Sequence, residues 1–505
     1  MASDPTPAPN ALHVRFESAS PNLPVDSLRI ARIKGHEAIS QLFTFTIDVA
    51  CVEPDDFHAN KVVGVEATLV FEQDDNELRR IHGMIAEVDQ LFQSSLDKDY
   101  TVYRLVLVPR AYRLALVETQ EVFLDTSIPD IAKQKLARVN LLDSEFRLTG
   151  GYFGGYAPRA FVVQYLESDL AFVSRLTEDL GISFFFDQSG GTDKMVFTDA
   201  SGGFRPVAGH ETAPFHSRGE EHGVYQLELK TRVIPKKWII QDYNHNTPHL
   251  DLTGMYNTPD GLAGGVVEYG PNVRTLAESK ALARVRAEER EAVCHAYSGV
   301  SDIITFTAGA QVKLEGHPSL PDQAVVLTEV VHEYSQPSPI EVKSDFERPY
   351  RNTFRALDPA LTYRPPRITK KPKIHGVQTG RIEPQPTGYV TNTPANDANG
   401  NYTVRFHFDT SPLGKKHRHS LPIRMIQTLS GGDYGVHFPL RVGIEVLVIF
   451  IDGDPDRPLI SGAVPNPLTL SPLKSVASSL SSRMQTNSGL LVHFKDGPGN
   501  GSSGG

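Results

Sequence analysis

The chain has 505 residues, with 50 Lys and Arg against 60 Asp and Glu, which gives a formal net charge of −10 at pH 7. Hydrophobic residues make up 40% and charged residues 22%, so the composition excludes wholesale disorder and fibrous repeats. At roughly 150 residues per domain, this length predicts about three domains. An acidic chain is a poor general nucleic-acid binder, because duplex phosphates attract a basic surface.

Cysteine content and the N-terminal sequence indicate the compartment. Cys51 and Cys294 are too few for a disulfide scaffold or a multi-cysteine zinc module, and they favour synthesis in a reducing compartment. The opening residues MASDPTPAPNALHVRF lack the basic and apolar regions of a secretory signal. The most apolar run, Ile444 to Ile451, is too short to span a bilayer and predicts a buried strand. If the protein leaves the cell, we expect it to do so without the usual signal.

The N-terminal part of the chain is predicted to be mostly β. Residues 1–24 begin with a proline-containing stretch without periodicity and are predicted to be disordered. Runs of β-branched and aromatic residues then predict strands at 42–47, 66–71 and 100–108. A first helix is predicted over 127–137, where a serine can cap and a proline suits the first turn.

The second predicted helix has the strongest local signals. It covers Asp169 to Leu180, whose apolar residues recur on one face. Ser168 is placed to act as the N-cap and Gly181 as the residue after the C-cap. The next residues, ISFFF at 182–186, predict a strand.

A domain boundary is predicted after the third helix. That helix is expected over 275–292, with Arg284 and Glu288 spaced to pair on an exposed charged face. Residues 348–375 contain five prolines, a density that interrupts regular elements and stiffens a connection. We therefore predict a proline-rich linker there, between a domain region at 25–347 and a barrel at 376–468.

The barrel region is predicted to contain about five strands. Residues 401–409 alternate strictly, with Tyr402, Val404, Phe406 and Phe408 on one face. The remaining predicted strands lie within 376–390, 421–425, 444–451 and 459–464. This count predicts a small Greek-key barrel of the OB type. Residues 469–505 are expected to be a serine-rich linker followed by a short strand at 490–494 and a Gly/Ser end.

Motifs for catalysis and metal binding are missing or incomplete, so we predict no catalytic, cofactor-binding or metal-binding residues. The chain lacks a nucleophile elbow and a complete Walker A loop. Asp452, Asp454 and Asp456 alternate as in a calcium loop, but Arg457 stands where glycine is required, which favours a rigid polar turn. The remaining histidine pairs are His245 with His249, beside a proline, and His417 with His419, in a basic loop.

Two other classes of function remain as distant alternatives. An OB barrel can bind single-stranded nucleic acid through aromatic side chains in a basic groove. Tyr402, Phe406 and Phe408 share one strand face, however, and the period of two favours a core role. A cell-wall hydrolase would need an inserted domain of roughly 150 residues, for which the chain has no spare segment.

Several stretches together resemble the VgrG family of type VI secretion spike proteins. The most specific is VQYLESDLAFVSRLTEDLGISFFFD at 163–187, which resembles the family signature of an aromatic and acidic strand entering a helix that ends in Gly-Ile. The other matching stretches are GHEAISQLFTFTID at 35–48, RRIHGMIAEV at 79–88, residues 100–136, VRFHFD at 404–409 and residues 439–466. The resemblance extends over about residues 25–495.

The resemblance implies both a fold and a role. The implied fold is mainly β with some α (α+β), with phage-hub-like β-barrel domains at 25–347, an OB-fold barrel at 376–468 and the start of a truncated β-helix spike at 469–505. The implied role is non-enzymatic: a homotrimeric spike on the Hcp tube, contacting baseplate proteins and carrying a PAAR tip protein or an effector. It implies assembly in the bacterial cytoplasm, ejection without a signal peptide, and contact with a target membrane only by mechanical puncture. A spike from an extracellular contractile injection system or a phage-like tail is the alternative.

The chain departs from the family pattern in two places. LPIRMIQTLSGGDYG at 421–435 stands where the family usually has Trp-bearing stretches. The sequence LLVHFKDGPGNG resembles the first spike strand and turn, and only GSSGG follows it. The resemblance therefore implies a truncated or short-spiked chain.

Overall fold

The computed structural model describes residues 12–52, 57–74, 76–91, 100–206, 211–216, 222–336, 349–384, 395–410, 420–473 and 481–495. The chain divides into two compact units. Unit 1 consists of 1–117, 128–157 and 168–370, and unit 2 consists of 118–127, 158–167 and 371–505. The chain therefore enters unit 2 three times, twice as a short excursion out of unit 1.

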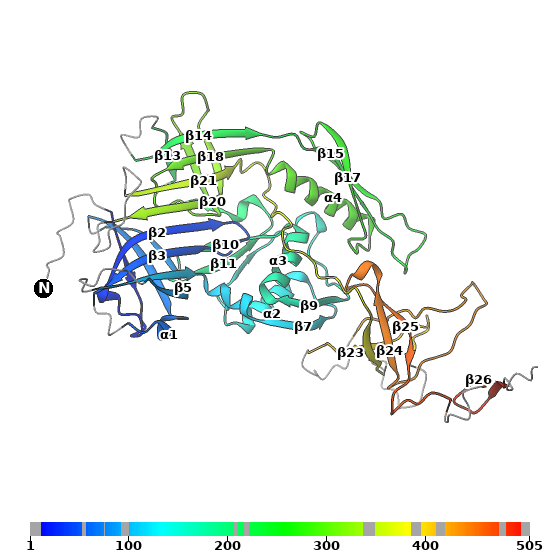
Figure 1. The fold of residues 1–505 in the computed structure, drawn as a ribbon. Helices are drawn as coiled ribbons and strands as arrows, with labels where there is room; N and C mark the ends of the chain where they lie inside the picture. Colours follow the sequence, from blue (N-terminus) through cyan, green and yellow to red (C-terminus); the bar gives the residue numbers. More distant parts are fainter. Residues whose placement is uncertain are drawn as a thin grey trace, which may run out of the picture. The chain divides into compact units, whose positions relative to one another are not determined.

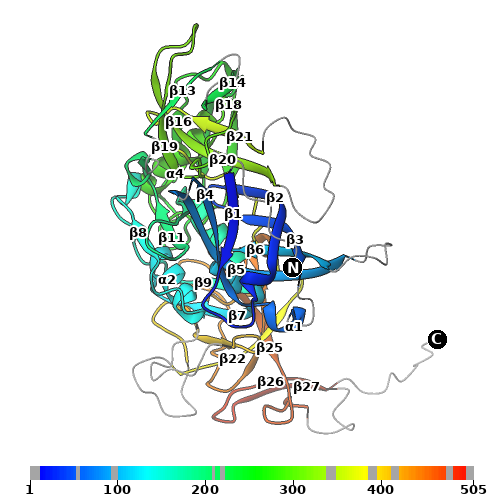
Figure 2. The ribbon, with the colours of Figure 1, turned by 90° about the vertical axis from the view of Figure 1, so that its left-hand side faces the viewer.

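A 13-stranded sheet forms the largest part of unit 1 (Figure 1). The order of strands along its main path is β1-β4-β5-β6-β3-β2-β20-β21-β18-β14. Off this path, β19 pairs with β20, and β12 and β13 each pair with β19. Figure 2 shows the end of the sheet at which β1, β4 and β5 lie beside one another. The bounds are β1 Leu12–Glu17, β2 Leu28–Ala38, β3 Thr44–Cys51, β4 Glu66–Gln73, β5 Asn76–Leu91, β6 Thr101–Val108, β12 Arg205–Pro206, β13 Thr212–Pro214, β14 Val224–Thr231, β18 His295–Ser301, β19 Ala310–Glu315, β20 Gln323–Ser335 and β21 Tyr350–Leu357.

Two predictions about irregular segments are wrong. Residues 12–17, within the N-terminal segment expected to be disordered, form β1, because alternate residues of LHVRFE are apolar and buried. Residues 350–357, within the predicted proline-rich linker, form β21, which pairs with both β18 and β20. No proline falls between Pro349 and Pro359, so the backbone N–H groups there are free to join the sheet.

Helices and two small sheets complete unit 1. The helices are α1 Ala59–Val62, α2 Ile128–Arg138, α3 Asp169–Leu180 and α4 Leu276–Glu291. One small sheet contains β8 Glu145–Arg147, β10 Ser183–Asp187 and β11 Lys194–Thr198. The other has the order β16-β15-β17, formed by Gly254–Asn257, Pro235–Gln241 and Ala263–Tyr269, and α4 packs against β15 and β16 (Figure 1).

The predicted helices are present, and the caps of α3 are confirmed. The hydroxyl of Ser168 accepts a hydrogen bond from the Ala171 N–H at 3.2 Å, and Gly181 ends α3 with φ of 70°. Arg284 and Glu288 of α4 form the predicted pair at 3.1 Å. The sequence predicted that this face is exposed, and that part of the prediction is wrong for Glu288. Glu288 is buried and accepts a hydrogen bond from Arg364, which lies elsewhere in unit 1.

Unit 2 contains the sheet of the predicted barrel, in the order β23-β22-β24-β25. These strands are Val404–Phe406, Gln378–Ile382, Glu445–Phe450 and Pro458–Val464. The two excursions add the paired strands β7 Glu118–Phe123 and β9 Val162–Ser168. Phe161 and Val163 from the second excursion belong to the same apolar core as Tyr402 and Phe406.

Three details of unit 2 differ from prediction. The alternating segment 401–409 contributes only the short strand β23, and 421–425 forms isolated bridges in place of a strand. Residues 481–485, expected to be part of a serine-rich linker, form β26. β26 pairs antiparallel with β27 Leu491–Lys495, the short strand that the sequence predicts.

Candidate functional site

The exposed face of the large sheet is polar over β14, β18, β20 and β21. We call it the polar sheet face. Side chains alternate across these strands, so that apolar residues point into the core while polar ones stay exposed. The face contains a depression of about 320 Å³. Its lining residues are Gln226, Glu228, Ser298, Gly299, Val300, Glu329, Val331, Thr353, Phe354 and Arg355.

Ion pairs join several charged side chains of the polar sheet face. Glu329 lies 3.1 Å from His36 Nε2 and 2.9 Å from Arg355 Nη1. The hydrogen bond with Glu329 raises the pKa of His36, and the same bond lowers the pKa of Glu329. A second pair joins Arg351 to Glu333 at 3.1 Å. Glu329 and Glu333 of the face are therefore paired with neighbouring cationic side chains.

A buried polar network lies beneath the sheet surface and has the residue types of a catalytic site. Glu37 accepts two hydrogen bonds of 2.8 Å from Arg79 Nη2 and lies 3.1 Å from His332 Nε2. The other imidazole nitrogen lies 2.8 Å from the hydroxyl of Tyr350. Burial alone would raise the pKa of Glu37, but the charge of Arg79 and the His332 hydrogen bond lower it to about 2. Burial lowers the pKa of His332, which keeps the ring neutral at pH 7.

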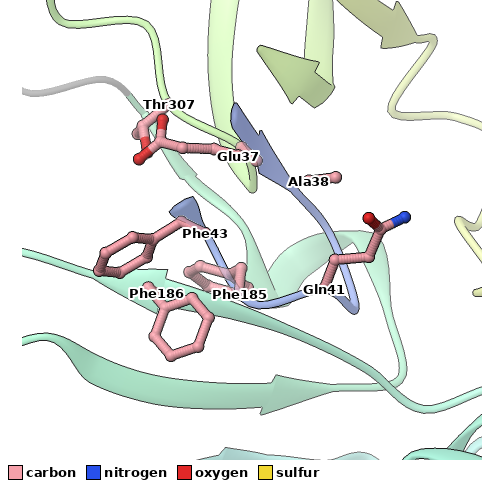
Figure 3. A pocket seen from close by; sticks show the side chains of 8 residues that line it. Glu37, Ala38, Gln41, Phe43, Phe185, Phe186 and Thr307 are labelled. Carbon is pink, nitrogen blue, oxygen red and sulfur yellow. The ribbon is translucent and has the colours of Figure 1, made fainter. Parts of the chain in front are cut away.

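The space beside this network is too small for a substrate. A cavity of about 10 Å³ lies between Glu37, Phe43, Phe185 and Phe186 (Figure 3). That volume holds one water molecule at most. The rings of Phe43 and Phe186 meet edge to face, with centroids 5.2 Å apart. The Glu37–His332–Tyr350 network joins β2, β20 and β21 within the core.

The aspartates of the predicted polar turn surround a lysine. Residues 451–453 form a 3-10 turn between β24 and β25, as the sequence predicts. Lys371 Nζ lies 2.5 Å from Asp454 Oδ1 and 2.7 Å from Asp456 Oδ2. Asp456 also accepts a hydrogen bond of 2.7 Å from the Val163 N–H. The lysine ammonium stands where a calcium ion would have to bind. These carboxylates therefore hold the turn in place through their contacts with Lys371 and Val163.

The other histidines considered for metal binding do not form a site in the described part of the chain. His245 and His249 lie in turns, and His417 and His419 lie outside the described residues. Across the described ranges, no three His, Cys, Asp or Glu side chains come close enough together to hold a metal ion. Within the same ranges, no helix is long and apolar enough to cross a membrane.

Comparison with known proteins identifies the family. Residues 36–338 match the phage tail baseplate hub (GPD) family, which covers more than half of the chain. The chain belongs to the phage tail baseplate hub family. Residues 386–464 of this hub-family chain match the type VI secretion system/phage-baseplate injector OB domain, which confirms an OB domain within the predicted barrel.

Relatives of the hub-family chain confirm its resemblance to VgrG proteins. The spike protein VgrG4b of Pseudomonas aeruginosa is 30% identical over 479 residues, which is 90% of this chain and 57% of that protein. The chain thus spans little more than half of that relative's length. Among solved structures, the chain is similar to the E. coli c3393 protein, with a TM-score of 0.63 and 21% identity. The match covers 89% of this chain and all of that one. The c3393 protein is described as a type VI secretion component with structural similarity to the T4 tail proteins gp27 and gp5.

A further structure shares the fold. A chain from the structure of the Francisella PdpA–VgrG complex has a TM-score of 0.62 at 9% identity, covering 96% of this chain and 83% of that one. The mainly β architecture predicted from the sequence is therefore confirmed at the level of hub fold and OB domain.

The sequence alone does not reveal the polar network of Glu37, Arg79 and His332. The available signal was local: Glu37 stands at an inward position of an alternating strand, between Gly35 and Ile39. A charged residue at such a position must find a buried partner. Its partners come from strands that are distant in sequence, so the sequence could indicate a buried pair but not its members.

Proposed function

We propose that this chain is a structural spike and hub protein of a type VI secretion system, working as a homotrimer on the Hcp tube to help deliver effectors. The observation that carries the proposal is the order of two matches in one chain, a baseplate hub at 36–338 followed by an injector OB domain at 386–464. The role is non-enzymatic. A puncturing device transmits force through packed interfaces, which requires no enclosed pocket or activated nucleophile.

The proposed partners follow from the same role. They are two further copies of the chain, the Hcp tube, baseplate proteins, and a PAAR tip protein or effector on a spike that begins at the β26–β27 hairpin. The polar sheet face, with its ion pairs, suits contact with other proteins during assembly and ejection. We propose assembly in the bacterial cytoplasm followed by ejection, with target membranes contacted only by puncture and no nucleic-acid partner.

A spike of an extracellular contractile injection system or a phage-like tail is the second candidate. It is favoured by the breadth of the OB-domain family, whose description covers both type VI secretion and phage baseplates. The two candidates share fold, symmetry and mechanics, and they differ in the tube protein that the hub meets.

Co-elution of the full chain with candidate tube proteins tests the proposal. We expect the chain to bind Hcp from a type VI system encoded in the same genome and not a phage-type tube protein. Binding only to the phage-type tube would select the second candidate. Failure to bind either tube protein, with a chain that is folded by circular dichroism, would contradict both.

A further inference from the structure

A protruding segment of the barrel, residues 428–439, is exposed along its whole length. We call it the finger. Backbone hydrogen bonds hold it in shape: the Val436 N–H donates to the Leu429 carbonyl at 3.0 Å, and the Gly431 N–H donates to the Tyr434 carbonyl at 2.8 Å. The finger is therefore a hairpin with its own internal pairing.

The finger carries large apolar side chains that are exposed in the described part of the chain. Leu429 is 51% exposed, Tyr434 70%, Val436 41% and Phe438 56%. Single exposed apolar residues are ordinary, but several of them on one ordered projection mark an interaction surface. Tyr and Phe are also the residue types that interfaces concentrate.

The β26–β27 hairpin is a second apolar element of unit 2 without cover. Met484, Leu490, Leu491, Val492 and Phe494 are all at least 40% exposed. Leu491 and Val492 are neighbours on one strand and so point to opposite faces, which leaves both faces open. A two-stranded hairpin of this size is marginal by itself in water, so it needs a surface to pack against.

The charges of the two elements are complementary. Asp433, at the tip of the finger, is the only carboxylate among residues 428–439. On the hairpin, Arg483 carries a guanidinium whose buried Nε atom has no hydrogen-bond partner among the described residues. A carboxylate is the strongest partner for a guanidinium. A finger that reaches Arg483 from another copy of the chain would bring the carboxylate of Asp433 to this guanidinium.

We propose that the finger of one copy docks on the β26–β27 hairpin of the neighbouring copy, so that finger and hairpin form the repeating contact of a closed ring. This inference rests on the proposed homotrimer. A cyclic assembly needs two different, complementary patches on each copy, whereas a two-fold dimer needs one self-complementary patch. Unit 2 carries two such patches of unlike shape and opposite charge, and each is exposed in the described part of the single chain.

A crosslinking experiment tests this contact directly. A full chain carrying both Asp433→Cys and Arg483→Cys is oxidised and run on a non-reducing gel. The native Cys51 and Cys294 are buried and do not compete. We expect a covalent species of three times 55.6 kDa, while each single-cysteine chain stays at the monomer mass. A disulfide formed within one chain, or no disulfide at all, would overturn the inference.

Solution mass provides a second test with a matched control. The finger variant Leu429→Ser, Tyr434→Ser, Phe438→Ser changes only exposed side chains. Its control, Leu250→Ser, Val267→Ser, Tyr269→Ser, changes side chains in unit 1 that are similarly exposed, at 51%, 58% and 69%. We expect the finger variant to show at least a roughly tenfold rise in the trimer dissociation constant, and the control to match the wild type.

The outcomes separate this inference from the proposed function. A wild-type trimer whose finger variant remains equally trimeric would overturn the finger contact and leave the spike proposal standing. A wild-type chain that is monomeric would contradict the proposed trimer, and the finger contact with it. Binding of the finger to Hcp or to an effector, with an unchanged trimer, would also overturn the inference.

Discussion

Lys135 Nζ lies 2.8 Å from Asp169 Oδ1, and both side chains are completely buried. Lys135 belongs to α2 and Asp169 begins α3, the two helices with which the chain re-enters unit 1 after the excursions at 118–127 and 158–167. The Asp169 N–H also donates to the carbonyl of Val117, the last residue before the first excursion, at 2.8 Å. The pair therefore stabilises the point of unit 1 from which both excursions leave and to which they return.

Breaking this pair should strongly destabilise unit 1. The variant Lys135→Met leaves the Asp169 carboxylate buried without its ammonium, which costs about 3–5 kcal/mol of unfolding free energy. The control Lys133→Met breaks an exposed pair with Asp130 at 3.4 Å, worth about 0–1 kcal/mol. Denaturant unfolding followed by the fluorescence of Trp238, the single tryptophan, measures both. Equal effects of the two variants would contradict the account.

The glycine that ends α3 should tolerate no side chain. Gly181 has φ of 70°, and a Cβ there would lie 2.7 Å from Val285 Cγ1 and 2.8 Å from Arg364 Cδ. Gly264 has a similar φ of 74° but has no atom within 4 Å of such a Cβ. Gly264→Ala should cost about 1–2 kcal/mol from backbone conformation alone, and Gly181→Ala should cost more because of the added clash. Thermal unfolding of the two variants compares them, and a smaller loss for Gly181→Ala would contradict the packing.

The contributions of two histidines to folding stability should depend on pH with opposite signs. The pKa of His332 is lowered by burial, so its contribution to stability is present above the unfolded value near 6.5 and is lost as the pH falls. The pKa of His36 is raised by Glu329, so its contribution is present below 6.5 and is lost as the pH rises through its folded value.

Melting temperatures at pH 7.5 and 5.5 check these signs. Relative to the wild type, His332→Gln should lose less stability on acidification, because the cost of protonating a buried imidazole is removed. His36→Gln should lose more, because the gain from its pairing with Glu329 is removed. Parallel pH profiles for both variants would show that neither assignment of the pKa direction holds.

The excursions should be necessary for the barrel core. Phe161 is 4% exposed and belongs to the core cluster of unit 2, with its ring centroid 6.3 Å from that of Phe406. Phe161→Ala should destabilise unit 2 by about 3–5 kcal/mol, whereas Leu166→Ala, at a side chain 64% exposed, should have little effect. Hydrogen exchange in β22 to β25 measures the change. Unchanged protection in Phe161→Ala would mean that the excursion is dispensable.

Local signals in the sequence predicted the helices well. Ser168 and Gly181 bracket α3, and both caps depend on residues within one helical turn. Runs of β-branched and aromatic residues likewise predicted β3, β4 and β6, because the preference of these residue types for strands is local. The order of the 13-stranded sheet could not be read in this way, since each pairing joins segments far apart in the chain.

The chain's buried charges show why other features escaped prediction. Arg286 belongs to the highly charged helix α4, yet its side chain is fully buried. Its partners are Asp179 at 2.5 Å and Glu268 at 3.0 Å, from α3 and β17. A pattern along one helix cannot reveal carboxylates supplied by other elements. The excursions at 118–127 and 158–167 were missed for the same reason, because their strands resemble any other strands of unit 1 until their partners are known.

The solution mass of the full chain, measured by light scattering behind size exclusion, tests the spike proposal most directly. The account predicts three times 55.6 kDa, independent of concentration in the micromolar range. A trimer would mean that the residues of this chain are sufficient to close the ring. A stable species of 55.6 kDa at every concentration would contradict the account, because a spike that punctures through three-fold contacts cannot be built from a chain that does not associate.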